Sequence, residues 1–116
     1  MAVMKIEEDF FSDRTEVMAD IASTGFWPTT YVSGASPELP LHYHDWDIIG
    51  YVIKGSTYLL DANGEQVAIG PGTRLTIPRG AWHAEGAATD NVTYIVTVAE
   101  PVPFTEALMP KEPKGP

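Results

Sequence analysis

Two stretches decide the fold of this chain: HYH at residues 42–44 and GTRLTIPRGAWH at residues 72–83. They hold all three histidines of the 116-residue sequence. In a β-strand the side chains at positions i and i+2 point to the same face, so a strand at residues 41–44 would direct two imidazoles at one point. Histidine is the commonest protein ligand of transition metals. We therefore predict that His42 and His44, joined by His83 from a neighbouring strand, bind one divalent metal ion.

The overall composition narrows the class of protein. With a net charge of −9 and seven Lys and Arg, the chain offers no basic stripe for nucleic acid. It has no cysteine, which excludes a disulfide scaffold and a Cys-based zinc site. No run approaches the roughly 18 apolar residues of a membrane span, and residues 1–9 lack the apolar core of a signal peptide. We expect a cytoplasmic protein that binds neither nucleic acid nor membrane.

Short segments rich in Ile, Val, Thr and Tyr fill the middle of the chain and alternate with Gly, Pro and Asn-Gly turns. Such segments are typical of strands. The predicted strands are 29–33, 41–44, 48–54, 57–61, 66–69, 74–77 and 92–98. Asn63-Gly64 predicts a hairpin turn, because these residues readily adopt the positive φ values it needs. Short strands at this spacing predict an all-β antiparallel sandwich or barrel.

The two ends of the chain differ from this β pattern. Asp13 and Glu16 resemble a helix capping box, and Gly25 suits a helix C-cap, so we predict a short helix within residues 7–25. Five prolines after residue 100 disfavour regular structure there and suggest an extended arm. We divide the chain into an N-terminal arm (1–28), a β-barrel (29–99) and a Pro-rich tail (100–116).

The paired histidine motifs resemble those of small single-domain cupins. His42 and His44 are followed by the closing Gly55 at the cupin spacing, and residues 72–83 match every spacing of the second motif up to its histidine. The resemblance covers about residues 29–99. It implies a double-stranded β-helix, or jelly-roll barrel, that holds a metal inside. It also implies a homodimer, because small cupins commonly pair through edge strands.

The sequence departs from the cupin pattern at the position of the usual glutamate ligand, which is Ile48 here. Asp47 is adjacent, but strand alternation places it on the opposite face from His44 unless a bulge intervenes. We favour a three-histidine site with water in the open positions over one that recruits Asp47. Glu85 shares the parity of His83, so it is a candidate general base, substitute ligand or orienting partner, or else a solvated residue. The spacing does not select among Fe, Mn, Ni, Cu and Zn.

Other residues are candidates for a substrate pocket. By parity Trp46 and Ile48 should face inward with the histidines, and Trp82 adjoins His83. Further strand residues could supply a phenol or a guanidinium to an anionic substrate: Tyr31, Tyr58 and Arg74.

These features suggest a metal-dependent enzyme that acts on a small oxygen-rich organic molecule. With iron it could be a dioxygenase, such as those that cleave diketones. With zinc, manganese or nickel it could be an isomerase or lyase, because residues 47–55 resemble cupins that open uronate rings, although Ile48 departs from them. The alternative is a non-catalytic cupin module that binds a sugar or another small molecule.

Overall fold

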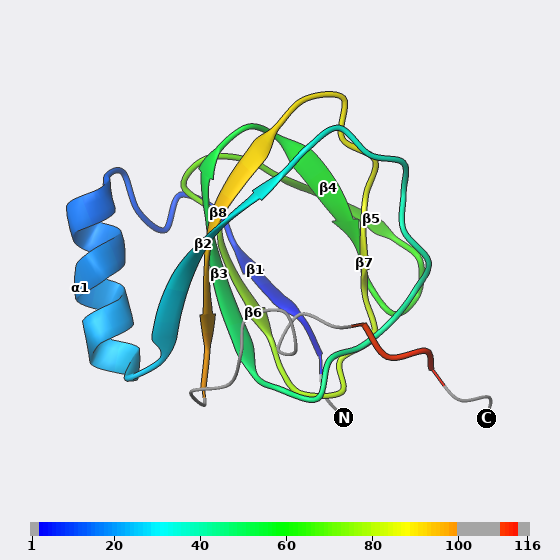
Figure 1. Ribbon diagram of the computed structural model, residues 1–116, viewed down its shortest axis with the longest axis horizontal. Coiled ribbons are helices and arrows are strands. Elements are labelled where there is room, and N and C mark those ends of the chain that lie inside the picture. The colour runs from blue at the N-terminus through cyan, green and yellow to red at the C-terminus, as the bar shows by residue number, and fades with distance from the viewer. Residues whose placement is uncertain (1–2, 100–109, 114–116) are drawn as a thin grey trace.

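The computed structural model describes residues 3–99 and 110–113 (Figure 1). Its elements, in chain order, are β1 (Lys5–Glu7), α1 (Arg14–Thr24), β2 (Trp27–Ser33), β3 (Ile48–Lys54), β4 (Thr57–Leu60), β5 (Gln66–Ile69), β6 (Arg74–Ile77), β7 (Ala84–Glu85) and β8 (Val92–Val98). The all-β class predicted from the sequence is confirmed, together with one short helix.

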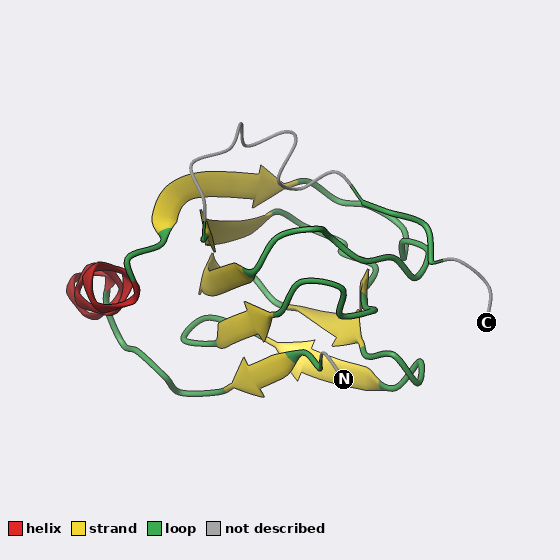
Figure 2. Cartoon of the chain, turned by 90° about the horizontal axis from the view of Figure 1, so that it is seen from below, coloured by secondary structure: helices red, strands yellow, loops and turns green. Residues whose placement is uncertain are grey.

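The strands form two antiparallel sheets that face each other and enclose an interior (Figures 1 and 2). The larger sheet has five strands in the order β1-β6-β3-β8-β2, and the smaller has three in the order β5-β4-β7. β3 lies at the centre of the larger sheet and pairs with β6 on one side and β8 on the other. Its side chains therefore form much of one wall of the interior.

Both faces of β3 are covered, because α1 packs on the outside of the larger sheet (Figure 1). Ile49 and Tyr51 point outward and form a core cluster with Val17 and Ile21 of the helix. The alternate residue Val52 lies in a separate cluster inside the barrel. The strand thus reads as a continuous apolar run rather than an alternating one.

The helix begins and ends as the sequence predicts. The Asp13 side chain accepts the backbone N–H of Glu16 at 2.9 Å, and the Glu16 carboxylate in turn accepts the N–H of Ser12 at 3.1 Å. Gly25 has a φ of 74°, and its N–H donates to the carbonyl of Ile21. These bonds satisfy backbone groups that the ends of a helix leave without partners.

The strand prediction needs correction at four points, one of which is that β4 ends at Leu60 rather than at residue 61. Residues 41–44 form no continuous strand, only isolated bridges of His42 with His83 and of Tyr43 with Lys111. β1 and β7 were not predicted, because three and two residues are too few to show an alternating pattern. β2 starts two residues early and contains Pro28, which an edge strand accommodates because one side of its backbone makes no ladder bonds.

The turn after β4 also differs from the predicted form. Only Gly64 in it has a positive φ, of 78°. The Asp61 side chain accepts the backbone N–H groups of Asn63 and Glu65 instead, so an aspartate-capped turn replaces one with two positive φ values.

Most of the predicted tail at residues 100–116 lies outside the described residues. Within 110–113, Lys111 exchanges two backbone hydrogen bonds with Tyr43, and its ammonium lies 3.4 Å from the carboxylate of Asp45. This part of the tail therefore attaches to the segment that carries His42 and His44 of its own chain.

In the part of the chain that the structure describes, no helix has the length and apolar character needed to cross a membrane.

Gly55→Ala should destabilise the fold more than Gly64→Ala. Both glycines have a positive φ, so alanine costs about 1–2 kcal/mol of backbone strain at either position. A Cβ at position 55 would also lie 2.5 Å from the carbonyl oxygen of Asn91, whereas nothing lies within 4 Å of one at position 64. Urea unfolding followed by circular dichroism measures both losses, and equal losses would contradict the steric argument.

Candidate metal centre

The centre is built on a backbone bridge between His42 and His83. The N–H of His42 donates to the carbonyl of His83 at 2.8 Å, and the N–H of His83 donates to that of His42 at 2.9 Å. Residues paired in this way lie directly opposite each other, with their side chains on the same face. The two ring centroids are consequently 4.6 Å apart.

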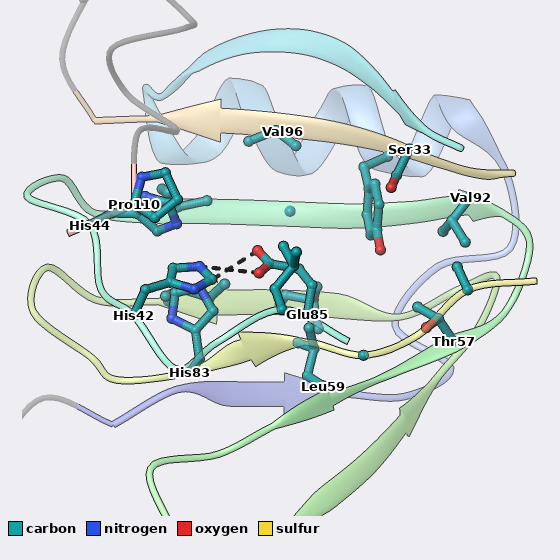
Figure 3. Close-up of a pocket in the computed structure, with 18 of the residues that line it drawn as sticks. Ser33, His42, His44, Thr57, Leu59, His83, Glu85, Val92, Val96 and Pro110 are labelled. Atoms are coloured by element: carbon teal, nitrogen blue, oxygen red, sulfur yellow. Dashed lines mark ion pairs between the residues drawn. The ribbon is translucent and has the colours of Figure 1, made fainter. Parts of the chain in front are cut away.

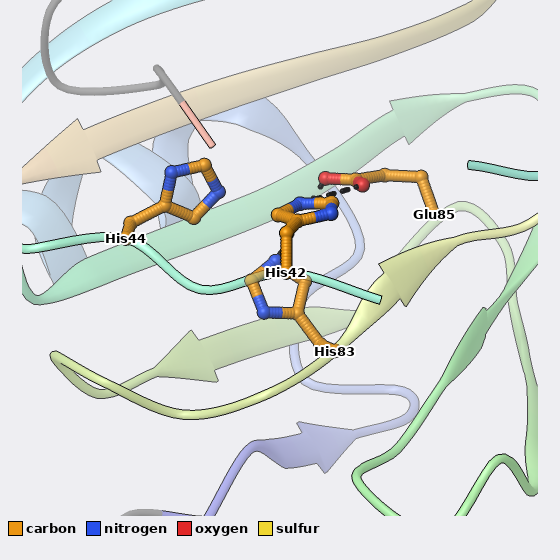
Figure 4. A group of neighbouring side chains, drawn as sticks. All are labelled: His42, His44, His83 and Glu85. Carbon is orange, nitrogen blue, oxygen red and sulfur yellow. Dashed lines mark ion pairs between the residues drawn. The ribbon is translucent and has the colours of Figure 1, made fainter. Parts of the chain in front are cut away.

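Two further residues complete the group. The ring of His44 lies with its centroid 5.2 Å from that of His42 and 5.2 Å from that of His83. Glu85, which follows His83 by two residues along β7, points its carboxylate at the same place (Figure 4). One ligand atom from each of His42, His44, His83 and Glu85 lies within 4.8 Å of the others.

Hydrogen bonds orient two of the rings. Nδ1 of His42 lies 2.7 Å from the carbonyl oxygen of Pro40, and Nδ1 of His83 lies 3.0 Å from that of Ala81. A carbonyl only accepts, so Nδ1 is the protonated nitrogen in each ring. Nε2 of each neutral ring then carries a lone pair directed at the centre, as in histidines that bind metal ions.

The donor atoms require a positive charge between them. Nε2 of His42 lies 3.1 Å from Oε2 of Glu85, yet both atoms are buried and neither has a hydrogen-bond partner among the described residues. Nε2 of His83 is also buried without a hydrogen-bond partner among the described residues, and it lies 3.8 Å from Oε1 of Glu85. Lone pairs this close repel each other unless a proton or a metal cation lies between them. The group therefore fits a divalent ion.

The ionisation of the group is consistent with this. Burial raises the pKa of Glu85, but the hydrogen bond and charge of His42, together with the charge of His83 and a backbone hydrogen bond, lower it by more, so the pKa lies below its ordinary value. Burial lowers the pKa of His83. Burial also lowers the pKa of His42. The hydrogen bond and negative charge of Glu85, together with the bond to the carbonyl of Pro40, raise this pKa by more, so the net shift is upward. The centre thus offers an ionised carboxylate and the neutral imidazole of His83, and a metal ion would compete with a proton for Nε2 of His42.

A cavity of about 310 Å³ opens beside the group (Figure 3). Its lining includes all four members of the group and is otherwise mostly apolar. The apolar part comprises Leu39, Ile48, Gly50, Leu59, Leu75, Ile77, Ala88, Val92 and Val96. Pro110 of the tail also lines it and lies beside His44 in Figure 3.

The comparisons with known proteins agree with this architecture. The family model of the cupin domain matches residues 29–99. The chain belongs to the cupin family. A search of the curated proteins finds none that matches it.

Solved structures of other cupin-like proteins resemble the chain. The polyketide cyclase RemF from Streptomyces resistomycificus is 30% identical with a TM-score of 0.53, and the match covers 67% of this chain and 57% of that one. A DUF861 family protein from Thermotoga maritima is 20% identical with a TM-score of 0.60 over 82% of this chain and 98% of that one. The DMSP lyase DddQ from Ruegeria pomeroyi is 19% identical with a TM-score of 0.57, over 66% of this chain and 39% of that one. The chain thus spans little more than half of the cyclase.

In this cupin the carboxylate beside the histidines comes from Glu85 and not from Asp47. Asp47 is exposed, and its carboxylate accepts the backbone N–H of Arg79 at 2.8 Å. That bond ties the loop after the first motif to the corner of the second, so Asp47 has a structural partner outside the group. Ile48, at the usual glutamate position, is buried and lines the cavity as alternation predicts.

Several predicted pocket residues lie away from the cavity lining that the described residues form. Trp46 packs against a core cluster that includes Ile48, and Trp82 is 40% exposed. The hydroxyl of Tyr58 donates to Glu38 at 2.7 Å. The backbone of Tyr31 pairs with Tyr94 in β2, and its side chain lies outside the described part.

Arg74 faces the opposite side of its sheet from the cavity. Its Nε lies 3.1 Å from the Asp20 carboxylate and its Nη1 3.2 Å from that of Glu7. It also lies over the ring of Phe10, 4.8 Å from its centroid. Together with Tyr51, which donates to Asp20, these residues connect β1, α1, β3 and β6 rather than bind substrate.

Tyr94 lines the cavity from β8, although it is not among the predicted pocket residues. Val92 and Val96, two residues to either side, line it as well. Alternation along a strand with one apolar face would have indicated this phenol.

Loss of one imidazole should weaken metal binding strongly. His44→Ala leaves two imidazoles and one carboxylate, so we expect divalent-ion affinity to fall by more than roughly 100-fold. Asp47→Asn is the matched control, because that carboxylate lies outside the group, and its affinity should equal that of the unaltered protein. Competition with a chromophoric chelator measures both; a loss in Asp47→Asn equal to that in His44→Ala would place the ion elsewhere.

Tyr51→Phe should change the response of stability to alkaline pH. Burial and the bond to Asp20 raise the pKa of Tyr51 to about 12, against about 10 in unfolded chains. Between these values the folded protein keeps a proton that the unfolded chain has lost, so the free energy of unfolding falls as pH rises through this window. Over this window the free energy of unfolding of the phenylalanine variant should fall by roughly 2 kcal/mol less than that of the unaltered protein. Urea unfolding at pH 9 and pH 12 measures the change in the free energy of unfolding for each protein. An equal change in both proteins would contradict the raised pKa of Tyr51.

Proposed function

We propose that this cupin is a metal-dependent enzyme that acts on a small molecule with an apolar body and a carbonyl or enol group. The observation that carries the proposal is the group of His42, His44, His83 and Glu85 at one end of a largely apolar cavity. Concave apolar sites with a few convergent polar groups are the usual form of small-molecule sites.

In this proposal the three histidines hold the ion. A divalent ion bound there supplies Lewis-acid polarisation of a substrate oxygen. The apolar walls bind the body of the substrate and exclude water, which strengthens electrostatic interactions within the cavity.

Glu85 acts as the general base. It is the one carboxylate among the described residues that line the cavity, and its lowered pKa keeps it ionised at neutral pH. It removes a proton from the carbon next to the carbonyl. The electrons of the broken C–H bond move onto the carbonyl oxygen, and the proton stays on the carboxylate until it returns to the product.

The similarity to the polyketide cyclase supports this reaction type. At 30% identity the cyclase is nearer in sequence than the two DMSP lyase structures, at 22% and 19%. Proton abstraction next to a carbonyl is a step common to cyclisation and elimination. We therefore favour cyclase or lyase chemistry without an oxidant over dioxygenation. The homodimer and the cytoplasmic location stay predictions.

The test begins with metal analysis of the purified protein, followed by assays with 1,3-dicarbonyl compounds. We expect a stoichiometric divalent ion and metal-dependent conversion without O₂ uptake. Consumption of O₂ with iron bound would replace the proposal with a dioxygenase. Saturable binding without conversion under any metal would replace it with a ligand-binding module.

Glu85→Gln separates the two roles open to this carboxylate. If Glu85 is the base, turnover should fall by at least roughly 100-fold while the metal content stays unchanged. Glu65→Gln, in the exposed turn between β4 and β5, is the control and should retain full turnover. Loss of the metal together with the turnover would make Glu85 a ligand and refute its role as base.

A further inference from the structure

The cavity has two different ends (Figure 3). The histidines lie at one end, and Ser33 and Thr57 lie at the other, with Leu59 and Val96 between them in this view. The hydroxyl-bearing residues of the lining are Ser33, Ser36, Thr57 and Tyr94. A molecule that fills the cavity therefore meets cation-binding groups at one end, hydrocarbon in the middle and neutral hydroxyls beyond.

The charges of the lining limit what this molecule can carry. No Lys or Arg belongs to the lining among residues 3–99 and 110–113, because Arg74 faces Glu7 and Asp20 on the other side of its sheet. An anionic group at the hydroxyl end would find no countercharge in the lining, at a cost in free energy. A polyhydroxylated molecule would leave most of its hydroxyls against apolar walls.

Gly50 leaves open space at the wall of the cavity. It is buried at the centre of β3 and lines the cavity. Glycine weakens a strand interior, and it often marks a bulge, a bend or a close approach of backbone or ligand. The backbone does not require a glycine at position 50. Gly50 is not one of the described glycines that have a positive φ. The nearest atoms to an added Cβ would be those of Leu75 at 3.9 Å, which is an ordinary contact.

We propose that the cavity selects an uncharged, largely hydrocarbon body that lies against Gly50, with an oxygen group at the histidine end and one neutral hydrogen-bonding group that reaches Tyr94. The inference rests on the proposed function for the role of the histidine end only. We expect uronates and other sugars, which the sequence suggested as ligands, to bind less tightly than such a molecule.

Calorimetric titration tests the inference with three probes: 1-phenylbutane-1,3-dione, its para-hydroxy derivative and galacturonate. The protein is used loaded with zinc and also free of metal. We expect both diketones to bind more tightly than galacturonate, and the para-hydroxy compound to bind most tightly. Equal or tighter binding of galacturonate would overturn the proposal.

Two variants locate the binding. Gly50→Val should weaken binding of both diketones by more than roughly tenfold, because its side chain occupies the space of the body, while zinc content and folding stay unchanged. Tyr94→Phe should remove the advantage of the para-hydroxy compound, about five- to tenfold, and leave the unsubstituted diketone unaffected. Gly64→Ala, a glycine in a surface turn, is the control.

The outcomes separate this inference from the proposed function. If the protein binds no metal, the proposed function fails, but the effect of Gly50→Val on the metal-free protein still tests the cavity. Unchanged diketone binding in Gly50→Val would overturn the inference whatever the metal content.

Discussion

The backbone bridge between His42 and His83 is the constraint on which the rest of the site depends. It joins two segments that are far apart in the sequence and fixes them in a register where both imidazoles share a face. Each ring then donates Nδ1–H to the carbonyl two residues before it. Because the fold itself sets position, orientation and tautomer, a metal ion needs little rearrangement of either ring to bind.

The sequence predicts the fold well where local rules act alone. β3, β5, β6 and β8 have the predicted bounds, since β-branched runs between Gly and Pro corners are determined locally. Residues 41–44 fail as a strand because their partners are single residues from distant segments. Pairing of that kind leaves no periodic pattern for a sequence analysis to detect.

Alternation predicts which residues share a face, but not which face is the interior. Along β6, Leu75 and Ile77 line the cavity, so Arg74 must point outward. There the helix supplies Asp20 to pair with it, which makes a partly buried arginine tolerable. The sequence suggested an inward arginine because nothing in it shows that α1 covers the outer face of this sheet. For the same reason Tyr94 was overlooked while Tyr58 was favoured.

The strand that carries the carboxylate near the histidines affects which molecule the cavity can bind. In cupins with the usual motif, a glutamate ligand would stand at position 48, on the five-stranded sheet. Here the carboxylate that lies beside the histidines is that of Glu85, on the facing sheet. Position 48 is thereby free to be isoleucine, and together with Gly50 it gives β3 an entirely apolar inner surface at this end. A carboxylate at position 48 would have to be solvated or paired beside the ligand. The position of Glu85 on β7 gives a negative charge near the histidines and leaves an apolar wall against which a hydrocarbon body can lie.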